Sequence, residues 1–235
     1  MVDSLLAWLA PRRCLLCREP AQGLDICPAC MDDLPWLGDG CRHCGLALAD
    51  SGSDRCAACA ASAGPESPDR LLAALAYEFP VDRLVAGLKY SRRLVCGRLL
   101  GDLLAIRIHE ERARPGFRLP EILLPVPLHP WRLLGRGFNQ ATEIARVVAA
   151  EHSLRLAPDK ARRVRNTPRQ TALSRKARLT NMRGAFSITA GLADSRVAIV
   201  DDVVTSAATT RELTRQLRAA GATDVQVWSV ARAIS

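Results

Sequence analysis

The sequence predicts an α/β fold: a domain built on a parallel β-sheet, preceded by a small module that cysteines hold together. Four Cys-x-x-Cys pairs lie within the first quarter of the 235-residue chain. Beyond residue 70, short apolar runs alternate with segments whose apolar residues repeat at helical spacing. Strands that alternate with helices are typical of a parallel sheet covered by helices.

The composition is that of a folded protein that does not cross a membrane. Apolar residues make up 49% of the chain and charged residues 24%, which excludes a disordered chain. No apolar run reaches the ~18 residues that span a bilayer. The apolar stretch 5–9 follows Asp3 rather than a basic leader, so we expect no secretory signal and a cytoplasmic location. Aromatic residues are only 4% of the chain, which argues against base stacking as the main binding mode.

The eight paired cysteines predict two structural zinc ions. The pairs are Cys14/Cys17, Cys27/Cys30, Cys41/Cys44 and Cys56/Cys59. In a reducing compartment such pairs indicate metal binding rather than disulfides, which are the alternative. Two pairs close one tetrahedral zinc site and leave no open position for a substrate. We expect pairs that are neighbours in sequence to share a metal.

Each remaining element follows from a local pattern. Residues 63–70 contain Gly64, Pro65 and Pro68, break all periodicity and predict a linker between a module at 1–62 and a domain at 71–235. Apolar spacing and caps then predict the following elements: helices over 81–90 and 94–112, a buried strand at 122–124, a helix capped by Asn139, a strand at 197–200, a helix that ends at Gly221, and a strand at 225–230.

The strand at 197–200 ends in residues that suit a phosphorylated sugar. Ligands of open α/β sheets bind at the carboxyl ends of the strands. Here Asp201 and Asp202 leave the strand, and their carboxylates suit ribose hydroxyls or Mg²⁺. Backbone N–H groups at a turn into a helix bind phosphate. The turn consists of Thr205, Ser206, Ala207, Ala208 and Thr209. The alternative is an acidic strand end followed by an ordinary Ser/Thr helix cap.

The strand at 122–124 leads into a basic loop with a glycine hinge. Guanidinium groups bind phosphate oxygens in a bidentate fork, so this loop could clamp pyrophosphate. Its candidate residues are Val126, Arg132, Arg136, Gly137 and Asn139. The alternative is an exposed basic loop without a ligand.

Positive charge is concentrated in the segment 128–185, which holds thirteen Lys/Arg and three Asp/Glu residues. The formal charge of the whole chain is +9, and two zinc-thiolate sites would reduce it to about +5. The cluster comprises Arg162, Arg163, Arg165, Arg169, Arg175, Lys176 and Arg178, in a region without clear periodicity. This pattern fits a mobile loop that closes over a polyphosphate, a groove for the DNA backbone, or a solvated basic surface.

Together these motifs resemble the ComF competence proteins, a family with a type I phosphoribosyltransferase-like domain. The resemblance covers nearly the whole chain, and the Arg-Gly-Phe-Asn-Gln motif followed about sixty residues later by an Asp-Asp-Val segment is highly specific. Besides the cysteines it rests on Leu88-Lys89-Tyr90, Pro125-Val126-Pro127, residues 136–140, Gln170, Arg178, Asn181, Gly184-Ala185-Phe186 and residues 200–209.

The resemblance implies a site for phosphoribosyl pyrophosphate with Mg²⁺. Asp201 and Asp202 would hold the ribose hydroxyls, the turn 205–209 the 5′-phosphate, and the loop 126–139 would face pyrophosphate and Mg²⁺. It also implies a role in natural transformation, with single-stranded DNA handled at the inner face of the cytoplasmic membrane beside DNA-uptake or replication and recombination proteins. Two functions stay open: a phosphoribosyltransferase, and a non-catalytic single-stranded-DNA-binding or scaffold protein.

The turn departs from the family pattern at two positions. The family has threonine and glycine where this chain has Ser206 and Ala207. Serine keeps the hydroxyl group. Alanine adds a methyl group where a left-handed backbone or a close phosphate would favour glycine, so we expect weaker phosphate binding.

Overall fold

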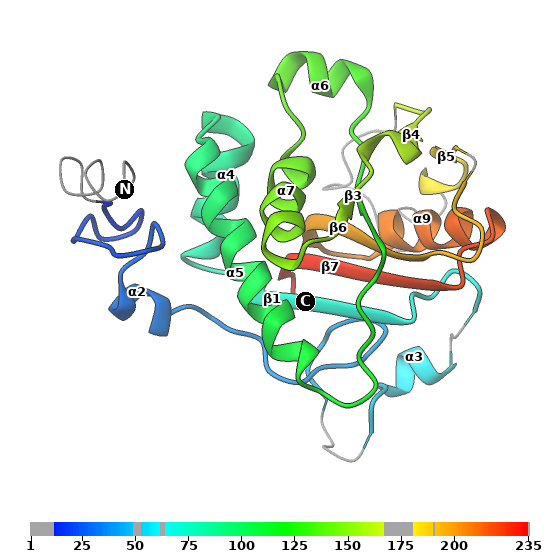
Figure 1. Ribbon diagram of the computed structural model, residues 1–235, viewed down its shortest axis with the longest axis horizontal. Helices are drawn as coiled ribbons and strands as arrows, with labels where there is room; N and C mark the ends of the chain where they lie inside the picture. Colours follow the sequence, from blue (N-terminus) through cyan, green and yellow to red (C-terminus); the bar gives the residue numbers. More distant parts are fainter. Residues whose placement is uncertain (1–11, 49–52, 62–63, 167–180, 190, 235) are drawn as a thin grey trace.

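A five-stranded parallel sheet forms the centre of the computed structural model, which describes residues 12–48, 53–61, 64–166, 181–189 and 191–234 (Figure 1). All neighbouring strands of this sheet pair in parallel. Their order is β1 (Arg70–Ala76), β7 (Asp224–Arg232), β6 (Arg196–Val204), β2 (Ile122–Pro125) and β3 (Arg155–Leu156). The predicted α/β fold with a parallel sheet is confirmed.

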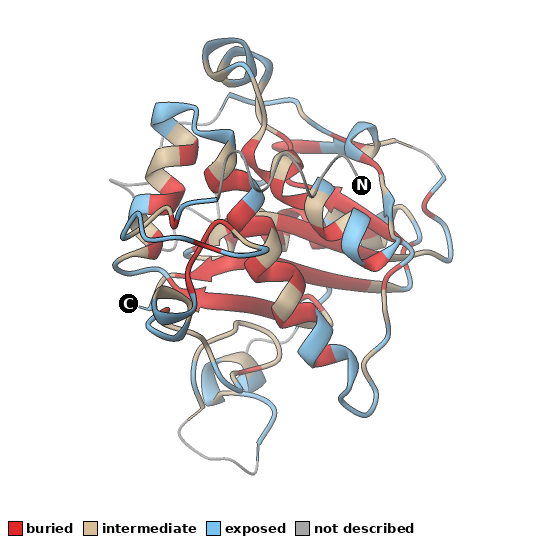
Figure 2. Ribbon diagram, turned by 60° about the vertical axis from the view of Figure 1, so that its left-hand side comes forward, coloured by how far each residue is buried: buried red, intermediate tan, exposed pale blue. Residues whose placement is uncertain are grey.

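Helices cover both faces of the sheet, and strands β1, β2, β6 and β7 are largely buried between them (Figure 2). One core joins the sheet to α4 (Val81–Ser91), α5 (Leu94–Arg112) and α7 (Gln140–His152). The other core joins it to α9 (Ala208–Ala219). Along β6, Ala198 and Val200 lie in the first core, whereas Val197 and Ile199 lie in the second, as the pleat of a strand requires. The expected helices and central strands are confirmed to within a few residues at their ends. Strand β6 runs four residues beyond the expected end at 200, so Asp201 and Asp202 lie on the strand rather than after it.

Several short elements were not predicted. Strand β1 is buried on both faces, so its sequence shows no alternation of apolar and polar residues. The loop after β2 contains the short helix α6 (Pro130–Arg136), and η1 (Pro158–Lys160) follows β3. The pair β4 (Ala161–Arg163) and β5 (Phe186–Ile188) is antiparallel. Arg162 and Arg163 therefore lie on a strand, where the lack of periodicity had suggested an irregular loop.

The eight paired cysteines form two separate four-sulfur clusters. Cys14, Cys17, Cys27 and Cys30 make the first cluster, and Cys41, Cys44, Cys56 and Cys59 the second. Within each cluster the sulfur atoms lie within 4.8 Å of one another. A zinc–sulfur bond of about 2.3 Å places tetrahedral sulfurs about 3.8 Å apart, and the Cys44 and Cys56 Sγ atoms lie 3.8 Å apart. Both clusters fit a zinc ion, and each consists of two pairs that are neighbours in sequence, as expected.

The backbone around each cluster already favours thiolate. Burial raises the pKa of Cys14, but hydrogen bonds from the backbone N–H groups of Cys17 and Cys27 outweigh it and lower that pKa to about 6. The pKa of Cys41 falls to about 7 in the same way, with backbone hydrogen bonds from Cys56 and His43 outweighing burial. Each cluster thus holds one sulfur prepared to bind a cation before the metal arrives.

The two clusters lie at different sides of the sheet domain. The helix α2 (Pro28–Asp32) of the first cluster and α3 (Ala57–Ala61) of the second are far apart in Figure 1. The first cluster packs against α5, because Cys14, Ile26 and Leu34 share a core with that helix. The buried carboxylate of Asp25 also accepts a hydrogen bond of 2.8 Å from Arg98 Nε of α5.

The chain between the clusters runs along the free edge of β1. The Leu37 amide donates to the Ala74 carbonyl at 2.9 Å, and the Ala76 amide donates to the Pro35 carbonyl at 2.8 Å. Further along, the Leu71 amide donates to the Arg42 carbonyl at 2.6 Å. These bonds use backbone groups that an edge strand would otherwise expose for pairing with another chain.

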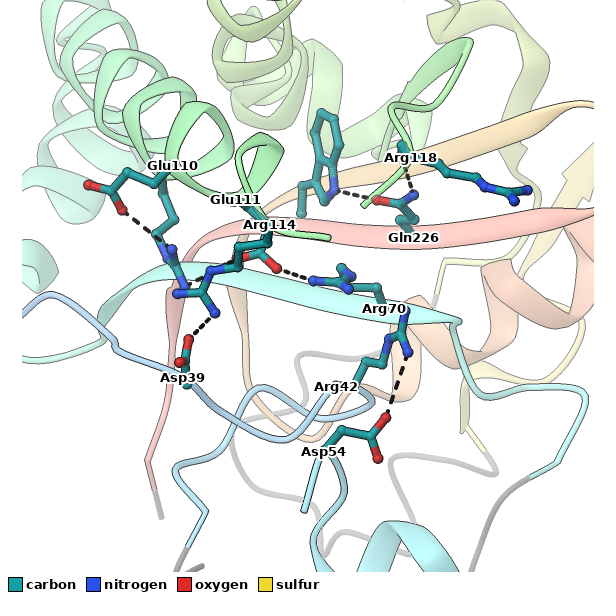
Figure 3. A network of polar contacts seen from close by, with 11 residues as sticks. Asp39, Arg42, Asp54, Arg70, Glu110, Glu111, Arg114, Arg118 and Gln226 are labelled. Carbon is teal, nitrogen blue, oxygen red and sulfur yellow. Dashed lines mark hydrogen bonds and ion pairs between the residues drawn. The ribbon is translucent and has the colours of Figure 1, made fainter. Parts of the chain in front are cut away.

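The buried carboxylate of Glu111 links the chain between the two clusters to α5 (Figure 3). Glu111 forms ion pairs with Arg70 of β1, with Arg107 of its own helix and with Arg114. Arg114 also pairs with Asp39, which lies on the chain between the clusters. Sharing one carboxylate among three guanidinium groups compensates a charge that burial would otherwise penalise.

We expect the purified protein to hold two zinc ions per chain. Cys14→Ser and Cys59→Ser should each remove one zinc and unfold part of the N-terminal module, because the metal supplies folding energy in segments with little apolar content. Cys96→Ser is the matched control: Cys96 is buried on α5, outside both clusters. Elemental analysis that finds no more than one zinc per loaded wild-type chain would contradict the two-site assignment.

Candidate functional site

The two strand ends singled out in the sequence are neighbours in the sheet. Strand β2 pairs with β6, and the Val126 amide continues this pairing by donating to the Val200 carbonyl at 2.9 Å. The loop after β2 therefore starts beside Asp201. Strand order is not visible in the sequence, and it is the structure that brings the two motifs together.

The two adjacent aspartates differ in their surroundings. Asp202 is 3% exposed and forms an ion pair with Lys89 of α4. Asp201 is partly exposed and accepts a hydrogen bond of 2.9 Å from the Asp202 amide. Burial raises the pKa of Asp201 well above its ordinary value, and the charge of Asp202 raises it further, while Lys89 opposes both. Lys89 thus pairs directly with Asp202, whereas the partly exposed carboxyl group of Asp201 lies at the strand end beside the turn.

Lys89 is a site residue to which the sequence analysis gave no role. Burial lowers its pKa, but the carboxylate of Asp202 outweighs burial and the net shift is upward, so Lys89 stays charged. The signal that could have found it was its place in the Leu88-Lys89-Tyr90 motif. Lys89 and Asp202 are far apart in the sequence, so their pairing could not be predicted from it.

The turn after β6 has the geometry of an anion cradle. Helix α9 begins at Ala208, so the N–H groups of its first turn lack partners within the helix. Ala207 has φ 58° and ψ 12°, the left-handed conformation that favours glycine. Asp201, Val203 and residues 204–210 line a hollow of about 30 Å³. That is room for roughly two water molecules, and it is too small for a nucleobase.

Asn139 organises the loop that follows β2. Its Oδ1 accepts from the Ala141 amide at 3.1 Å, which confirms it as the N-cap of α7, and its Nδ2 donates to the Val126 carbonyl at 3.0 Å. Gly137, with φ 87°, ends α6. Arg136 donates to the side chain of Gln140. One amide side chain therefore holds both ends of the 126–139 loop.

Basic residues of β4 lie near the same strand end. Burial lowers the pKa of Arg163 to about 10; the charge of Arg132 also lowers it, whereas the charge of Asp201 raises it. Arg163 thus lies within the electrostatic reach of both Asp201 and Arg132. Arg162 and Arg165 are exposed. A groove of about 800 Å³ lies between α6, the start of α7 and β4, with Arg162 and Arg163 in its wall.

Part of the predicted basic cluster lies outside the described residues. These residues are Arg169, Arg175, Lys176 and Arg178, together with Gln170. Within the described part of the chain, no helix is both long and apolar enough to cross a membrane.

An α/β protein with a double zinc ribbon is the class that the fold and the two clusters define, and residues 5–62 match the Double zinc ribbon domain family. Competence protein F of Haemophilus influenzae is 30% identical over 94% of this chain and 90% of its own length. DNA utilization protein YhgH is 32% identical in Escherichia coli K12 and 34% identical in Salmonella typhimurium LT2, each over 95% of this chain and 98% of that protein. The chain belongs to this competence protein F and YhgH family.

A solved structure offers only a weak likeness. The purine phosphoribosyltransferase from Pyrococcus horikoshii OT3 is 17% identical, with a TM-score of 0.34 over 69% of this chain and 77% of that one. A likeness at this level supports no transfer of site residues. The roles of individual side chains must come from the chain itself.

Ala207→Gly tests whether the turn is strained. A left-handed alanine costs roughly 1 kcal/mol relative to glycine, so the free energy of unfolding should rise by up to that amount. Ala208→Gly is the matched control, because Ala208 begins α9 with helical backbone and its replacement should destabilise by about 0.5–1 kcal/mol. Urea denaturation measures both. Equal destabilisation by the two variants would show that Ala207 is not strained.

Proposed function

We propose that this protein binds a phosphorylated ribose, of the class of phosphoribosyl pyrophosphate, at the carboxyl end of β6, as part of DNA utilization. The observation that carries the proposal is the turn 205–209. It opens a twelve-residue helix, holds a left-handed residue and encloses a small hollow that Asp201 also lines. Phosphate binds at helix N-termini because N–H groups and the helix dipole both favour negative charge there.

Each part of the site has its own task in this proposal. The N–H groups of 205–209, with the hydroxyls of Thr205, Ser206 and Thr209, bind the 5′-phosphate. Asp201 accepts from the ribose hydroxyls. Asp202 positions Asp201 by donating its backbone N–H to that carboxylate, and its own carboxylate is held by Lys89.

Mg²⁺ fits the site only together with a polyphosphate. This cation is usually held by one or two carboxylates plus substrate phosphates, and within the part of the chain that the structure describes no ion pair joins Asp201 to a basic side chain. When bound, Mg²⁺ would neutralise charge on the pyrophosphate. Arg132 and Arg136 on the 126–139 loop would bind the same group, so that phosphoribosyl transfer, where an acceptor is present, rests on stabilising the departing pyrophosphate.

A second candidate function, binding of single-stranded DNA, is favoured by the groove beside α6. Arg162 and Arg163 line its wall, and Arg165 lies exposed beyond it. Exposed arginines in a groove bind a nucleic-acid backbone without reading its sequence. The names of the relatives refer to competence and to DNA utilization. The groove and the turn at residues 205–209, the phosphate turn, use different residues, although Gly137 and Asn139 of the 126–139 loop also line the groove.

Asp201→Asn should weaken the binding of phosphoribosyl pyrophosphate in the presence of Mg²⁺ by at least about tenfold, since a carboxyl group that would accept from the ribose hydroxyls and bind Mg²⁺ is lost. Calorimetric titration with and without Mg²⁺ measures this. Asp32→Asn, the same charge change at an exposed position of α2, should leave binding unaltered. Absence of binding to the wild-type protein would overturn the proposed function.

The double variant Arg162→Gln with Arg165→Gln should bind an oligothymidylate more weakly and with a flatter dependence on salt, because fewer counterions are released. Fluorescence anisotropy at several salt concentrations measures the slope. Arg83→Gln, which removes an exposed charge from α4, is the control. Asp201→Asn should bind this DNA as tightly as wild type or slightly more tightly. Loss of both ligands in that variant would show one shared site.

A further inference from the structure

The last residue of β7 connects the second four-cysteine cluster to the phosphate turn. Arg232 is 7% exposed, and its Nε donates to the carbonyl of Cys44 at 2.7 Å. Its Nη1 lies 3.0 Å from the Val204 carbonyl oxygen and 2.6 Å from that of Thr205. The Arg232 guanidinium therefore donates to the backbone of Cys44 in the second cluster. It also donates to the last residue of β6, Val204, and to the first residue of the turn, Thr205.

The cluster and the turn are otherwise separated by a cavity. Cys44, Cys56 and Cys59 form one wall of a cavity of about 200 Å³, and residues 205–207 form another, with Arg232 between them. Arg232 connects the two walls of this cavity through its hydrogen bonds, and the Ala233 amide also donates to the Val204 carbonyl at 3.0 Å.

The backbone next to Cys44 is shaped for this approach. Gly45 has φ +69°, and a Cβ atom there would lie 2.6 Å from Leu71 Cδ2 and 3.9 Å from Arg232 Cδ. No other residue type would let the chain come as near to the sheet without displacing Leu71. The cluster is thus held at a fixed distance from Arg232.

A second route joins the cluster to the far end of α9. His43, between Cys41 and Cys44, has its Nδ1 2.7 Å from the Pro68 carbonyl oxygen. Next to Pro68, the Asp69 carboxylate pairs with Arg218 of α9 at 2.9 Å and accepts from the Val225 amide at 2.8 Å. The helix that begins at the turn is therefore held from the same cluster at its other end.

We propose that Arg232 is a positioning residue through which the second cysteine cluster, but not the first, holds the phosphate turn in shape. Ala207 occupies a left-handed conformation that alanine disfavours, so the turn needs support from outside its own residues. Arg232 supplies it by fixing the carbonyls of Val204 and Thr205 on the strand side. When zinc is bound, the Cys44 carbonyl is a rigid anchor for the guanidinium.

Hydrogen exchange of the full-length protein tests this proposal without any ligand. In Arg232→Met, amides of residues 204–210 should exchange about tenfold faster, the change expected when a charge-assisted hydrogen bond is lost. Exchange in residues 14–30 should not change. Arg232→Lys keeps the charge but not the forked set of donors, so it should give a smaller increase in the exchange rate. This second variant keeps the test valid if Arg232→Met misfolds. Wild-type exchange rates in 204–210 for both variants would overturn the proposal.

The two clusters supply a matched comparison. Cys56→Ser should speed exchange in 204–210, whereas Cys27→Ser, which removes one ligand from the first cluster, should not. Equal effects of the two variants, or no effect of Cys56→Ser, would overturn the selective role of the second cluster. The affinity of Arg232→Lys for phosphoribosyl pyrophosphate, which rests on the proposed function, should also fall. If wild type does not bind that ligand, the proposed function fails while the exchange data still decide the role of Arg232.

Discussion

The parallel pairing of β6 with its neighbours on both sides is the constraint on which the rest of the structure depends. Pairing with β2 sets the start of the 126–139 loop beside Asp201. Pairing with β7 sets Arg232 opposite Val204, where its guanidinium reaches the turn. Because β6 is buried on both faces, its register cannot slip without moving apolar residues out of both cores. The register of β6 therefore places Asp201, the start of the 126–139 loop and Arg232 together at the carboxyl ends of the strands.

The candidate site contains two features that the cores must stabilise. Ala207 is left-handed, at a cost of roughly 1 kcal/mol, and Asp202 and Lys89 are a largely buried ion pair. Such a pair contributes little net stability, yet loss of one partner alone costs on the order of 3–5 kcal/mol because a charge is left uncompensated. Asp202 is therefore a poor position for a test of ligand binding alone, whereas Asp201 can lose its charge with less effect on folding.

Much of the fold could be predicted from the sequence, because it depends on local patterns. Leucines at helical spacing predicted α4 and α5, and the side chain of Asn139 marked the start of α7. Strand β1 was not predicted because both of its faces are buried, which removes the alternation of apolar and polar residues. Contacts between distant residues could not be predicted: the pairing of Lys89 with Asp202, and of Arg232 with Cys44, depends on strand order and on how the cysteine segments pack. No local pattern records either.

The cysteine clusters are better understood as parts of the sheet domain than as an appendage to it. The first cluster adds Cys14, Ile26 and Leu34 to the core beside α5. The chain that leads to the second cluster pairs with the edge of β1. In that cluster the Cys44 carbonyl accepts a hydrogen bond from Arg232, the last residue of β7. These segments bury few apolar groups of their own, so bound metal must fix their conformation. Metal binding by the cysteines would therefore determine both whether β1 has an open edge and whether the turn at residues 205–209 keeps its shape.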